Sequence, residues 1–395
     1  MTEQLKLKLN DSKATRWGAL VIVAFTMMAA YYVNDVVAPL KTMLETDLAW
    51  SSTDFGFFTG GYSFLNVFFL MLIWGGLILD RFGIRFTGKL ATILMVGGTA
   101  LEYYAMTGLA GTDATLFGIN EIFGYKTGVF VAFAGYSIFG VGAEVAGITV
   151  SKIIAKWFKG KELATAMGVQ VALARIGSQA GYAVAIPLAR AFGISTPVLL
   201  GLVLLLGGMI AFFVFAVMDK KLDKQMEAAA IAAGTEDEEE KFSFKDVKNI
   251  LVNPGFWLIA LLCVLFYSCV FPFQKFASEL MIIKYGINEN VAGTFAGLPA
   301  LGALILTPVF GGFIDKRGKS ASIMLLGSAM LICVHFIYAI PDINYWLVAI
   351  VLMIILGIAF SLVPSAMWPA VAKIFPVSQL GTAYALIFFI QNIGL

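Results

Sequence analysis

Two residues of opposite charge, Glu144 and Arg175, lie inside long apolar stretches at a spacing that would let them act together. They flank a turn at Lys159 and Gly160, with 15 residues from 144 to 159 and 15 residues from 160 to 175. If both arms are helical, each charge lies about 22 Å from the turn, because a helix rises about 1.5 Å per residue. That depth is near the middle of a bilayer, where a charge costs roughly 2.5–3.5 kcal/mol. Such a cost predicts a functional pair that faces a cavity.

A carboxylate and a guanidinium that face one cavity are suited to a zwitterion. Arg175 would bind a carboxylate through two parallel hydrogen bonds, and Glu144 would bind an ammonium group. The alternative is a permanent ion pair that holds two helices in register. Glu102, a second deep acid, is a candidate proton site, as Glu144 is, or a hydrogen-bond partner of a neighbouring helix. Six polar residues are predicted to line the same space or to anchor span ends at the membrane surface: Tyr31, Asn34, Tyr62, Asn66, Tyr267 and Lys275.

Composition places these residues in a membrane. The chain of 395 residues is 60% hydrophobic and only 13% charged, against about 25% charged in soluble domains. This predicts an all-α protein that crosses the lipid bilayer many times, and it argues against a soluble enzyme. The net charge of +2 gives no sign of nucleic acid as a partner. Phosphate-binding loops, nucleophile elbows and metal-ligand spacings are absent from the sequence, so we expect neither an enzyme nor a cofactor or metal.

Apolar runs long enough to span a bilayer divide the chain into three parts. We predict a six-helix bundle at 1–218, a cytoplasmic linker at 219–249, and a second bundle at 250–395 that stops within an eleventh span, as in a truncated chain. Lys and Arg collect in alternate loops, which predicts a cytoplasmic N-terminus. The spans are expected at 17–40, 53–79, 88–108, 128–157, 162–189, 196–218, 255–282, 290–314, 320–340, 345–373 and 380–395.

An internal repeat relates the two halves. Residues 155–158 (AKWF) match 372–375 (AKIF) at a shift of 217, and 76–83 match 311–318 at a shift of 235. Two parallel bundles of this kind are the plan of major facilitator transporters. At the shift of 217, the counterparts of Glu144 and Arg175 are the neutral Ser361 and Asn392. An architectural pair would be expected in both halves, whereas a recognition pair is needed only once.

The loop between the second and third spans resembles the loop signature of that superfamily. Gly76 would let helices approach closely, and Asp80 would accept from backbone N–H groups at a helix start. Arg81 and Arg85 would pair across the cytoplasmic face. Such contacts are predicted to close one end of the pore. The residues assigned to this gate are Gly76, Asp80, Arg81, Gly83 and Arg85, with Asp315 and Lys316 in the repeat.

Several motifs together resemble the lysosomal dipeptide transporter family within the major facilitators. They include residues 157–163 (WFKGKEL), 174–178 (ARIGS) and 271–273 (FPF), and the resemblance runs from the first span to the last residue. It implies passage of dipeptides without ATP. It also implies that the glutamate of the fourth span and the arginine of the fifth recognise the dipeptide, and Glu144 and Arg175 match these two. The first span lacks the E-x-x-E-R stretch of proton-coupled oligopeptide transporters, so proton coupling stays open.

The loops here are short, so neither a lysosomal address nor the family's accessory glycoprotein carries over, and a bacterial inner membrane is expected. The predicted function is a secondary transporter of a small zwitterion, with dipeptides first, that works by alternating access. One alternative is an organic or inorganic anion exchanger in which Arg175 binds the anion. The other is a membrane sensor or assembly subunit that binds a solute without moving it.

Overall fold

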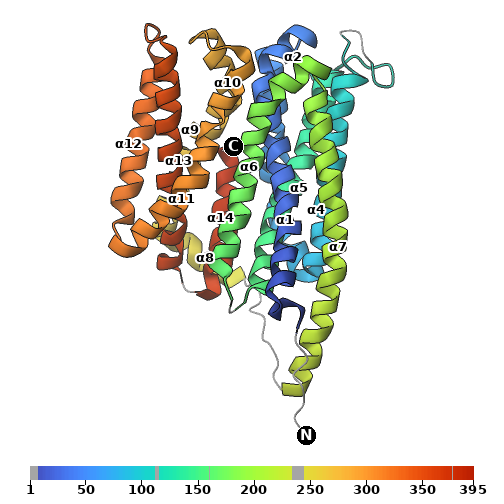
Figure 1. Ribbon diagram of the computed structural model, residues 1–395, viewed down its shortest axis with the longest axis vertical. Coiled ribbons are helices and arrows are strands. Elements are labelled where there is room, and N and C mark those ends of the chain that lie inside the picture. The colour runs from blue at the N-terminus through green and yellow to red at the C-terminus, as the bar shows by residue number, and fades with distance from the viewer. Residues whose placement is uncertain (1–7, 112–114, 160, 234–243, 376) are drawn as a thin grey trace.

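The chain is almost entirely helical (Figure 1). The computed structural model describes residues 8–111, 115–159, 161–233, 244–375 and 377–395, and it leaves out a few side chains within these ranges, Asp315 among them. The first half contains η1 (Leu9–Asp11), α1 (Lys13–Val36), η2 (Ala38–Leu40), α2 (Lys41–Asp47), α3 (Ser52–Phe68), α4 (Met71–Thr107), β1 (Glu121–Ile122), β2 (Tyr125–Lys126), α5 (Thr127–Trp157), α6 (Leu163–Phe192) and α7 (Thr196–Ala233). The second half contains α8 (Phe244–Val252), α9 (Pro254–Ile283), α10 (Glu289–Ala296), α11 (Leu298–Arg317), α12 (Ser320–Ala339), α13 (Trp346–Ile374) and α14 (Val377–Ile393).

Helix starts follow local sequence signals. Ser51 and Asp54 form a reciprocal capping box at the start of α3, which satisfies two backbone donors. Asn253 caps α9, and Pro254 occupies its first turn, where a missing N–H group costs nothing. The predicted spans lie mostly in helix, but the second is interrupted at Phe69 and Leu70, and the eighth is interrupted at Gly297 between α10 and α11.

The predicted second span is broken rather than continuous. α3 and α4 meet at a bend of 57° around Phe69 and Leu70, and Leu70 has a left-handed φ of 54°. α4 consists of two helical stretches that meet at a kink at Gly83, whose φ of 74° only glycine adopts readily, and this kink lies between the predicted second and third spans. Among the described residues, seven helices are long and apolar enough to cross a membrane, or eight if the bent pair α3 and α4 counts as one span. α14 is shorter, at 17 residues.

The predicted linker at 219–249 contains helix at both ends. α7 continues to Ala233, and α8 begins at Phe244. The residues between them lie outside the described part of the chain. The boundaries drawn from the sequence therefore remain a prediction.

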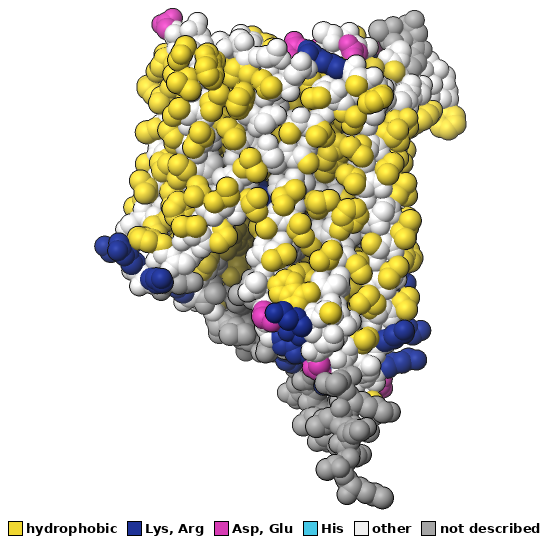
Figure 2. All heavy atoms as spheres, viewed as in Figure 1, with side chains coloured by type: hydrophobic (Ala, Val, Ile, Leu, Met, Phe, Trp, Pro, Cys, Tyr) yellow, Lys and Arg dark blue, Asp and Glu magenta, His cyan; other side chains and the backbone are white. Residues whose placement is uncertain are grey.

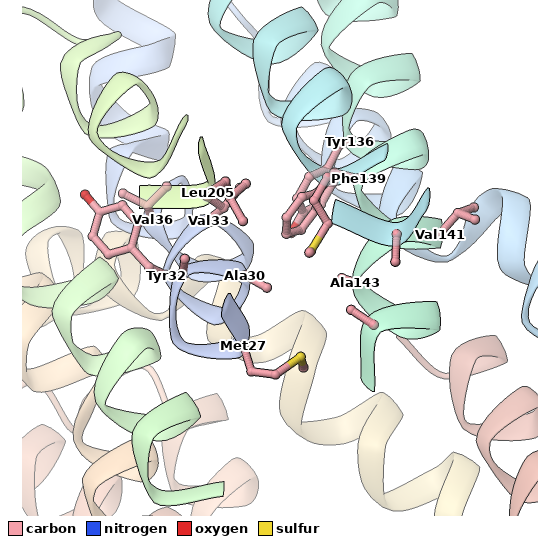
Figure 3. Close-up of a cluster of buried hydrophobic side chains, with 14 of the residues drawn as sticks. Met27, Ala30, Tyr32, Val33, Val36, Tyr136, Phe139, Val141, Ala143 and Leu205 are labelled. Carbon is pink, nitrogen blue, oxygen red and sulfur yellow. The ribbon is translucent and has the colours of Figure 1, made fainter. Parts of the chain in front are cut away.

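The hydrophobic core has two main parts. One, which we call the N-cluster, is built from α1 to α7, and the other, the C-cluster, from α8 to α14. Figure 3 shows part of the N-cluster, where Tyr32, Val33 and Val36 of α1 lie near Leu205 of α7. The Tyr32 hydroxyl donates to the Pro197 carbonyl at 3.2 Å, so this face of α1 is held against the start of α7. The neighbouring residue, Tyr31, points to a different surface.

The outside of the molecule has the polarity of a membrane protein. Hydrophobic side chains form a broad belt, and charged side chains gather toward the two ends (Figure 2). One end carries the N-terminus and the other carries α2 (Figure 1), and we call them the N-terminal end and the α2 end. Helices satisfy their own backbone hydrogen bonds, which suits them to a hydrocarbon environment.

Candidate functional site

Two glycines set the positions of Glu144 and Arg175. A Cβ atom on Gly140 would lie 2.2 Å from the Tyr62 carbonyl oxygen, so α5 rests directly on α3. A Cβ atom on Gly177 would lie 2.1 Å from the Met28 carbonyl oxygen, so α6 rests directly on α1. Small residues allow such close helix contacts in membranes. Glu144, one turn after Gly140, is thereby brought to α3, and Arg175, two residues before Gly177, is brought to α1.

Glu144 lies half-buried between the two clusters. The Tyr62 hydroxyl donates to Glu144 Oε1 at 2.9 Å. Asn392 of α14 interacts with the same carboxylate from the C-cluster. Glu144 therefore faces the surface between the clusters and not lipid.

Arg175 is held by aromatic rings from both clusters. Its Cζ atom lies 5.6 Å from the centroid of the Tyr31 ring and 5.0 Å from that of the Phe360 ring, within the range of cation–π contacts. Among the described residues, no carboxylate lies within 4.0 Å of its guanidinium, and none of its N–H groups donates a hydrogen bond. The permanent ion pair with Glu144 is therefore not formed, and the Arg175 donors are available to a ligand.

Tyrosines connect the two charges. Tyr31 is close enough to interact electrostatically with both Arg175 and Glu144. Tyr267 of α9 interacts with Arg175 and Tyr31 from the C-cluster. The predicted residues Tyr31, Tyr62 and Tyr267 thus surround the same space as Glu144 and Arg175.

Lys275 and Asn34 belong to a separate contact between the clusters. Lys275 Nζ donates to the Asn34 carbonyl oxygen at 2.5 Å and to the Tyr136 hydroxyl at 3.0 Å, and it lies 3.7 Å from Asp35 Oδ1. Tyr136 in turn donates to the Asn34 carbonyl at 2.8 Å. These bonds tie α9 to α1 and α5. In this conformation Lys275 is engaged by protein, so it does not join Arg175 as a second free cation.

Glu102 and Asn66 are completely buried. Neither carboxyl oxygen of Glu102 has a hydrogen-bond partner among the described residues, although Lys275 is near enough to interact with it electrostatically. Asn66 donates to the Tyr62 carbonyl at 3.4 Å, and its Oδ1 atom has no partner in the same set. Asn66 therefore supports the helix turn that carries Tyr62.

The loop signature forms ion pairs within the N-cluster. Lys152 donates to Asp80 at 3.0 Å, and Arg85 donates to Asp223 at 2.6 Å. Asp219, completely buried, lies 3.6 Å from Arg85. The described contacts of Asp80 do not include the expected backbone N–H groups, and Arg85 pairs with α7 rather than across to the C-cluster.

The other predicted gate residues are placed differently from expectation. A Cβ atom on Gly76 would meet no atom within 4 Å, whereas one on Gly75 would lie 2.5 Å from Val145 Cγ2, so the close helix approach occurs one residue earlier. Arg81 lies over the Phe82 ring at 5.5 Å. Lys316 is exposed, and the Asp315 side chain lies outside the described part of the structure.

The clusters are joined at the α2 end. Lys41 of α2 is 1% exposed; it pairs with Glu279 of α9, and donates to Glu45 at 2.7 Å and to Ser52 at 2.9 Å. Three further contacts cross between the clusters nearby: Arg190 with Glu289, Arg190 with Asn290 at 2.7 Å, and the Tyr182 hydroxyl with the Gln274 carbonyl at 3.1 Å. This end is therefore closed by hydrogen bonds and ion pairs.

The N-terminal end lacks a comparable closure among the residues that the structure describes. Its ion pairs stay within the N-cluster, including Arg16 with Glu162 at 2.7 Å and Lys161 with Asp11 at 2.7 Å. In Figure 2 the surface between the clusters is recessed toward this end. The conformation is thus closed at the α2 end and more open at the N-terminal end.

Acid is expected to loosen the contact between η1 and the turn that joins α5 to α6. The hydrogen bond from Lys161 lowers the pKa of Asp11, and the hydrogen bond from Arg16 lowers the pKa of Glu162. Because both pKa values are lower in the folded state, the pairing stabilises this contact above the unfolded pKa values, about 4, and is lost as pH falls through the folded values. A spin label on Lys8→Cys should become mobile below about pH 4. In the double variant Asp11→Asn, Glu162→Gln it should be mobile at every pH, and an acid response that survives in that variant would contradict the assignment.

Three residues at this interface escaped the sequence analysis as site residues: Tyr136, Phe360 and Asn392. Tyr136 lies eight residues before Glu144, about two helical turns along the same face. That spacing would have identified it as a candidate site residue. Asn392 is the repeat counterpart of Arg175, so the internal symmetry pointed to it. Phe360 carried no polar signal, and only the contact of its ring with the Arg175 guanidinium identifies it.

A hollow outside this site lacks the predicted charges. An apolar groove of about 450 Å³ between α9 and α12 is lined by residues that include Phe273, His335 and Tyr338. Glu144 and Arg175 are not among its lining residues. We therefore place the candidate site between the clusters, where the unpaired guanidinium lies.

Comparison with known proteins agrees with this architecture. Residues 20–395 match the family model described as Major Facilitator Superfamily. The chain is 29% identical over 396 residues to the lysosomal dipeptide transporter MFSD1 of Homo sapiens, covering 97% of this chain and 78% of that protein. The inward-open xylose transporter XylE from E. coli superimposes with a TM-score of 0.68 at 16% identity, covering 96% and 87% of the two chains. A bacterial homologue of the human lysosomal transporter Spinster, inward-facing and unoccupied, gives 0.65 at 15% identity, covering 97% and 80%. The predicted helical membrane fold and the predicted resemblance are both confirmed.

Proposed function

Because the chain belongs to the major facilitator superfamily and is a membrane transporter, we propose that it carries dipeptides or closely similar small zwitterions. The observation that carries this proposal is the Arg175 guanidinium, which lies between rings of both clusters without a carboxylate partner among the described residues. Similarity to proteins named as dipeptide transporters over 97% of the chain supports the same solute class.

Each charged end of a dipeptide has a matching group. Arg175 offers a planar fork of donors to the C-terminal carboxylate, which it can bind through two parallel hydrogen bonds. Glu144 offers a carboxylate to the N-terminal ammonium, and Tyr62 holds that carboxylate in place. Tyr31, near both charges, would lie along the peptide between its two ends. When a solute binds, charge-assisted hydrogen bonds would replace the cation–π contacts of Arg175. The binding free energy is then most favourable for a solute whose two ends are both ionised.

Alternating access would move the solute past this site. The site is built from α1, α3, α5 and α6 on one side and α9, α13 and α14 on the other, so rocking of the clusters would change its exposure. Closure at the α2 end would depend on the ion pairs of Lys41 and Arg190, with the Lys275 contact as a further tie between the clusters. The loop signature around Asp80 and Arg85 would form part of the opposite gate. From the distribution of Lys and Arg we propose a cytoplasmic N-terminus, and from the short loops a bacterial inner membrane.

Glu102 and Glu144 are the groups at which a proton could accompany the solute. A buried carboxyl without a donor is more stable as the neutral acid. Glu102 would exchange its proton only if water reached it in another conformation. Flux measured with and without a pH gradient tests this role separately from solute binding.

Blocked dipeptides test the proposal. We expect a free dipeptide to raise the midpoint of thermal unfolding of the purified protein. At a concentration of 100 times Kd, binding should increase the free energy of unfolding by about 2.7 kcal/mol. N-acetylated or C-amidated forms of the same dipeptide lack one charge and should give little or no shift. Uptake of the free dipeptide into proteoliposomes is expected alongside binding.

Other outcomes would identify the alternatives. Stabilisation by monoanions and not by zwitterions would replace the proposal with an anion exchanger. Binding without flux would favour a sensor or assembly subunit.

A further inference from the structure

The segment between α4 and α5 contains two tight turns of the same design. Residues 116–119 (LFGI) and 122–125 (IFGY) each place Phe-Gly between apolar residues. Leu116 pairs with Ile119, and β1 pairs with β2 in antiparallel register. The φ values are 55° and 80° in the first turn and 51° and 81° in the second. Positive φ at both central positions is the mark of the type I′ turn.

Phenylalanine is an unusual choice at the first central position. That position favours Asn, Asp or Gly, because a bulky side chain is strained at positive φ. Packing among the described residues does not explain the choice, since Phe117 is 95% exposed and Phe123 is 89% exposed. Two strained and exposed aromatic residues in one short segment indicate that something outside the chain contacts them.

We propose that residues 115–126, which we call the aromatic hairpin, insert Phe117 and Phe123 into the lipid interface beside the α2 end. The hairpin projects sideways from the bundle at that end (Figure 1). A hydrophobic group lies at the outer tip of this projection, beside the margin of the hydrophobic belt (Figure 2). Trp and Tyr concentrate at membrane–water interfaces, and apolar faces that carry Trp, Phe or Leu enter the boundary between headgroups and acyl chains by about 5–10 Å.

Aromatic contacts continue from the hairpin onto the bundle wall. The Tyr125 ring stacks on Phe57 of α3 at 3.8 Å, and Phe57 stacks on Phe133 of α5 at 4.2 Å. The Phe123 ring lies 5.9 Å from Phe130 of α5. The hairpin tip therefore continues a surface of half-buried aromatic side chains on α3 and α5, which favours lipid over a soluble partner.

The base of the hairpin is fixed to the bundle. Lys126 Nζ donates to the Ala49 carbonyl at 2.5 Å, and Thr127 donates through its hydroxyl to the Ile119 carbonyl at 2.8 Å. These bonds hold the tips away from the helices. A hairpin fixed to the N-cluster and inserted in lipid would anchor that cluster while the C-cluster moves against it.

Spin-label accessibility in liposomes tests the proposal. In a background with Cys263, Cys269 and Cys333 replaced by Ala, single labels are placed at Phe117→Cys, Phe123→Cys and, as the matched control, Glu121→Cys, an exposed position on the same hairpin. We expect labels at 117 and 123 to collide readily with oxygen and several-fold less with a water-soluble nickel chelate. The label at 121 should show the reverse.

A second variant keeps the test independent of the labelled phenylalanines. Phe117→Asn with Phe123→Asn relieves the turn strain, so the hairpin itself should remain folded. A label at Ile119→Cys should be protected from the chelate with both phenylalanines present and lose that protection in the Asn variant. Equal chelate access at 117, 121 and 123 would overturn the proposal. Labels shielded from both oxygen and chelate would also overturn it, because they would indicate a protein contact.

Discussion

Replacing Arg175 with alanine is expected to abolish dipeptide-induced thermal stabilisation and dipeptide uptake while the protein stays folded. The guanidinium has no carboxylate partner among the described residues, so its removal leaves no acid unpaired there. What is lost is the charge-assisted bond to the solute, worth about 2–5 kcal/mol when it is buried. The dissociation constant should therefore rise roughly 30-fold to more than 1,000-fold. Isothermal titration with a free dipeptide measures this change.

Two further variants make the Arg175 experiment specific. Arg175→Lys keeps the charge but loses the planar fork, so partial binding is expected. Arg317→Ala is the matched control, because Arg317 lies 5.0 Å from the Phe313 ring, a contact of the same kind and distance as that of Arg175 with Phe360. It should leave binding unchanged. Full dipeptide affinity in Arg175→Ala would remove the proposed role of this residue.

The Glu144→Gln variant tests recognition of the other end of the dipeptide in the same titration. In Glu144→Gln the side chain can still accept from the Tyr62 hydroxyl, but it no longer carries a charge. Discrimination between free and N-acetylated dipeptides should weaken, whereas discrimination at the carboxyl end should persist. Such a split would distinguish recognition of two separate ends from a general loss of affinity.

Much of the helical layout could be predicted because lipid imposes it. Long apolar runs and the alternation of basic loops placed a helix over every predicted span. The bend at Leu70 could not be predicted, because the sequence around it is uniformly apolar and gives no sign of a break. The kink at Gly83 lies between the second and third spans as they were drawn from the sequence, so this division was open to prediction.

The candidate site, like the helical layout, could be predicted only in part. Counting residues from the turn at Lys159 placed Glu144 and Arg175 at similar depth, and the structure brings both within reach of Tyr31. Depth does not fix rotation about the helix axis. The contacts at Gly140 and Gly177 set that rotation, and they direct Arg175 to aromatic rings rather than to Glu144. The bond from Lys275 to Asn34 depends on how two sequence-distant clusters approach each other, which local patterns do not encode.

Replacing Lys41 with methionine is expected to open the α2 end. Lys41 is completely buried and pairs with Glu45 of its own cluster and Glu279 of the other. Without the ammonium, two carboxylates face each other across the closed interface, and breaking a buried ion pair costs about 3–5 kcal/mol. Water can solvate these groups when the clusters separate, so the cost falls on the closed conformation. The population ratio should shift by at least roughly 100-fold toward the open form.

Distance measurements between spin labels at Asp47→Cys and Asn344→Cys, exposed positions on opposite clusters, report this opening in nanodiscs. We expect longer distances in Lys41→Met, and distances nearer to those of the unmodified protein when Glu279→Gln is added, because the second change removes part of the excess negative charge. Lys126→Met is the matched control, since Lys126 donates only to the Ala49 carbonyl within the same cluster among its described hydrogen bonds. It should leave the distances unchanged. Unaltered distances in Lys41→Met would show that closure at this end depends on apolar packing, the Arg190 contacts or the Lys275 contact instead, and the same measurement on Arg190→Met and Lys275→Met would then decide among these.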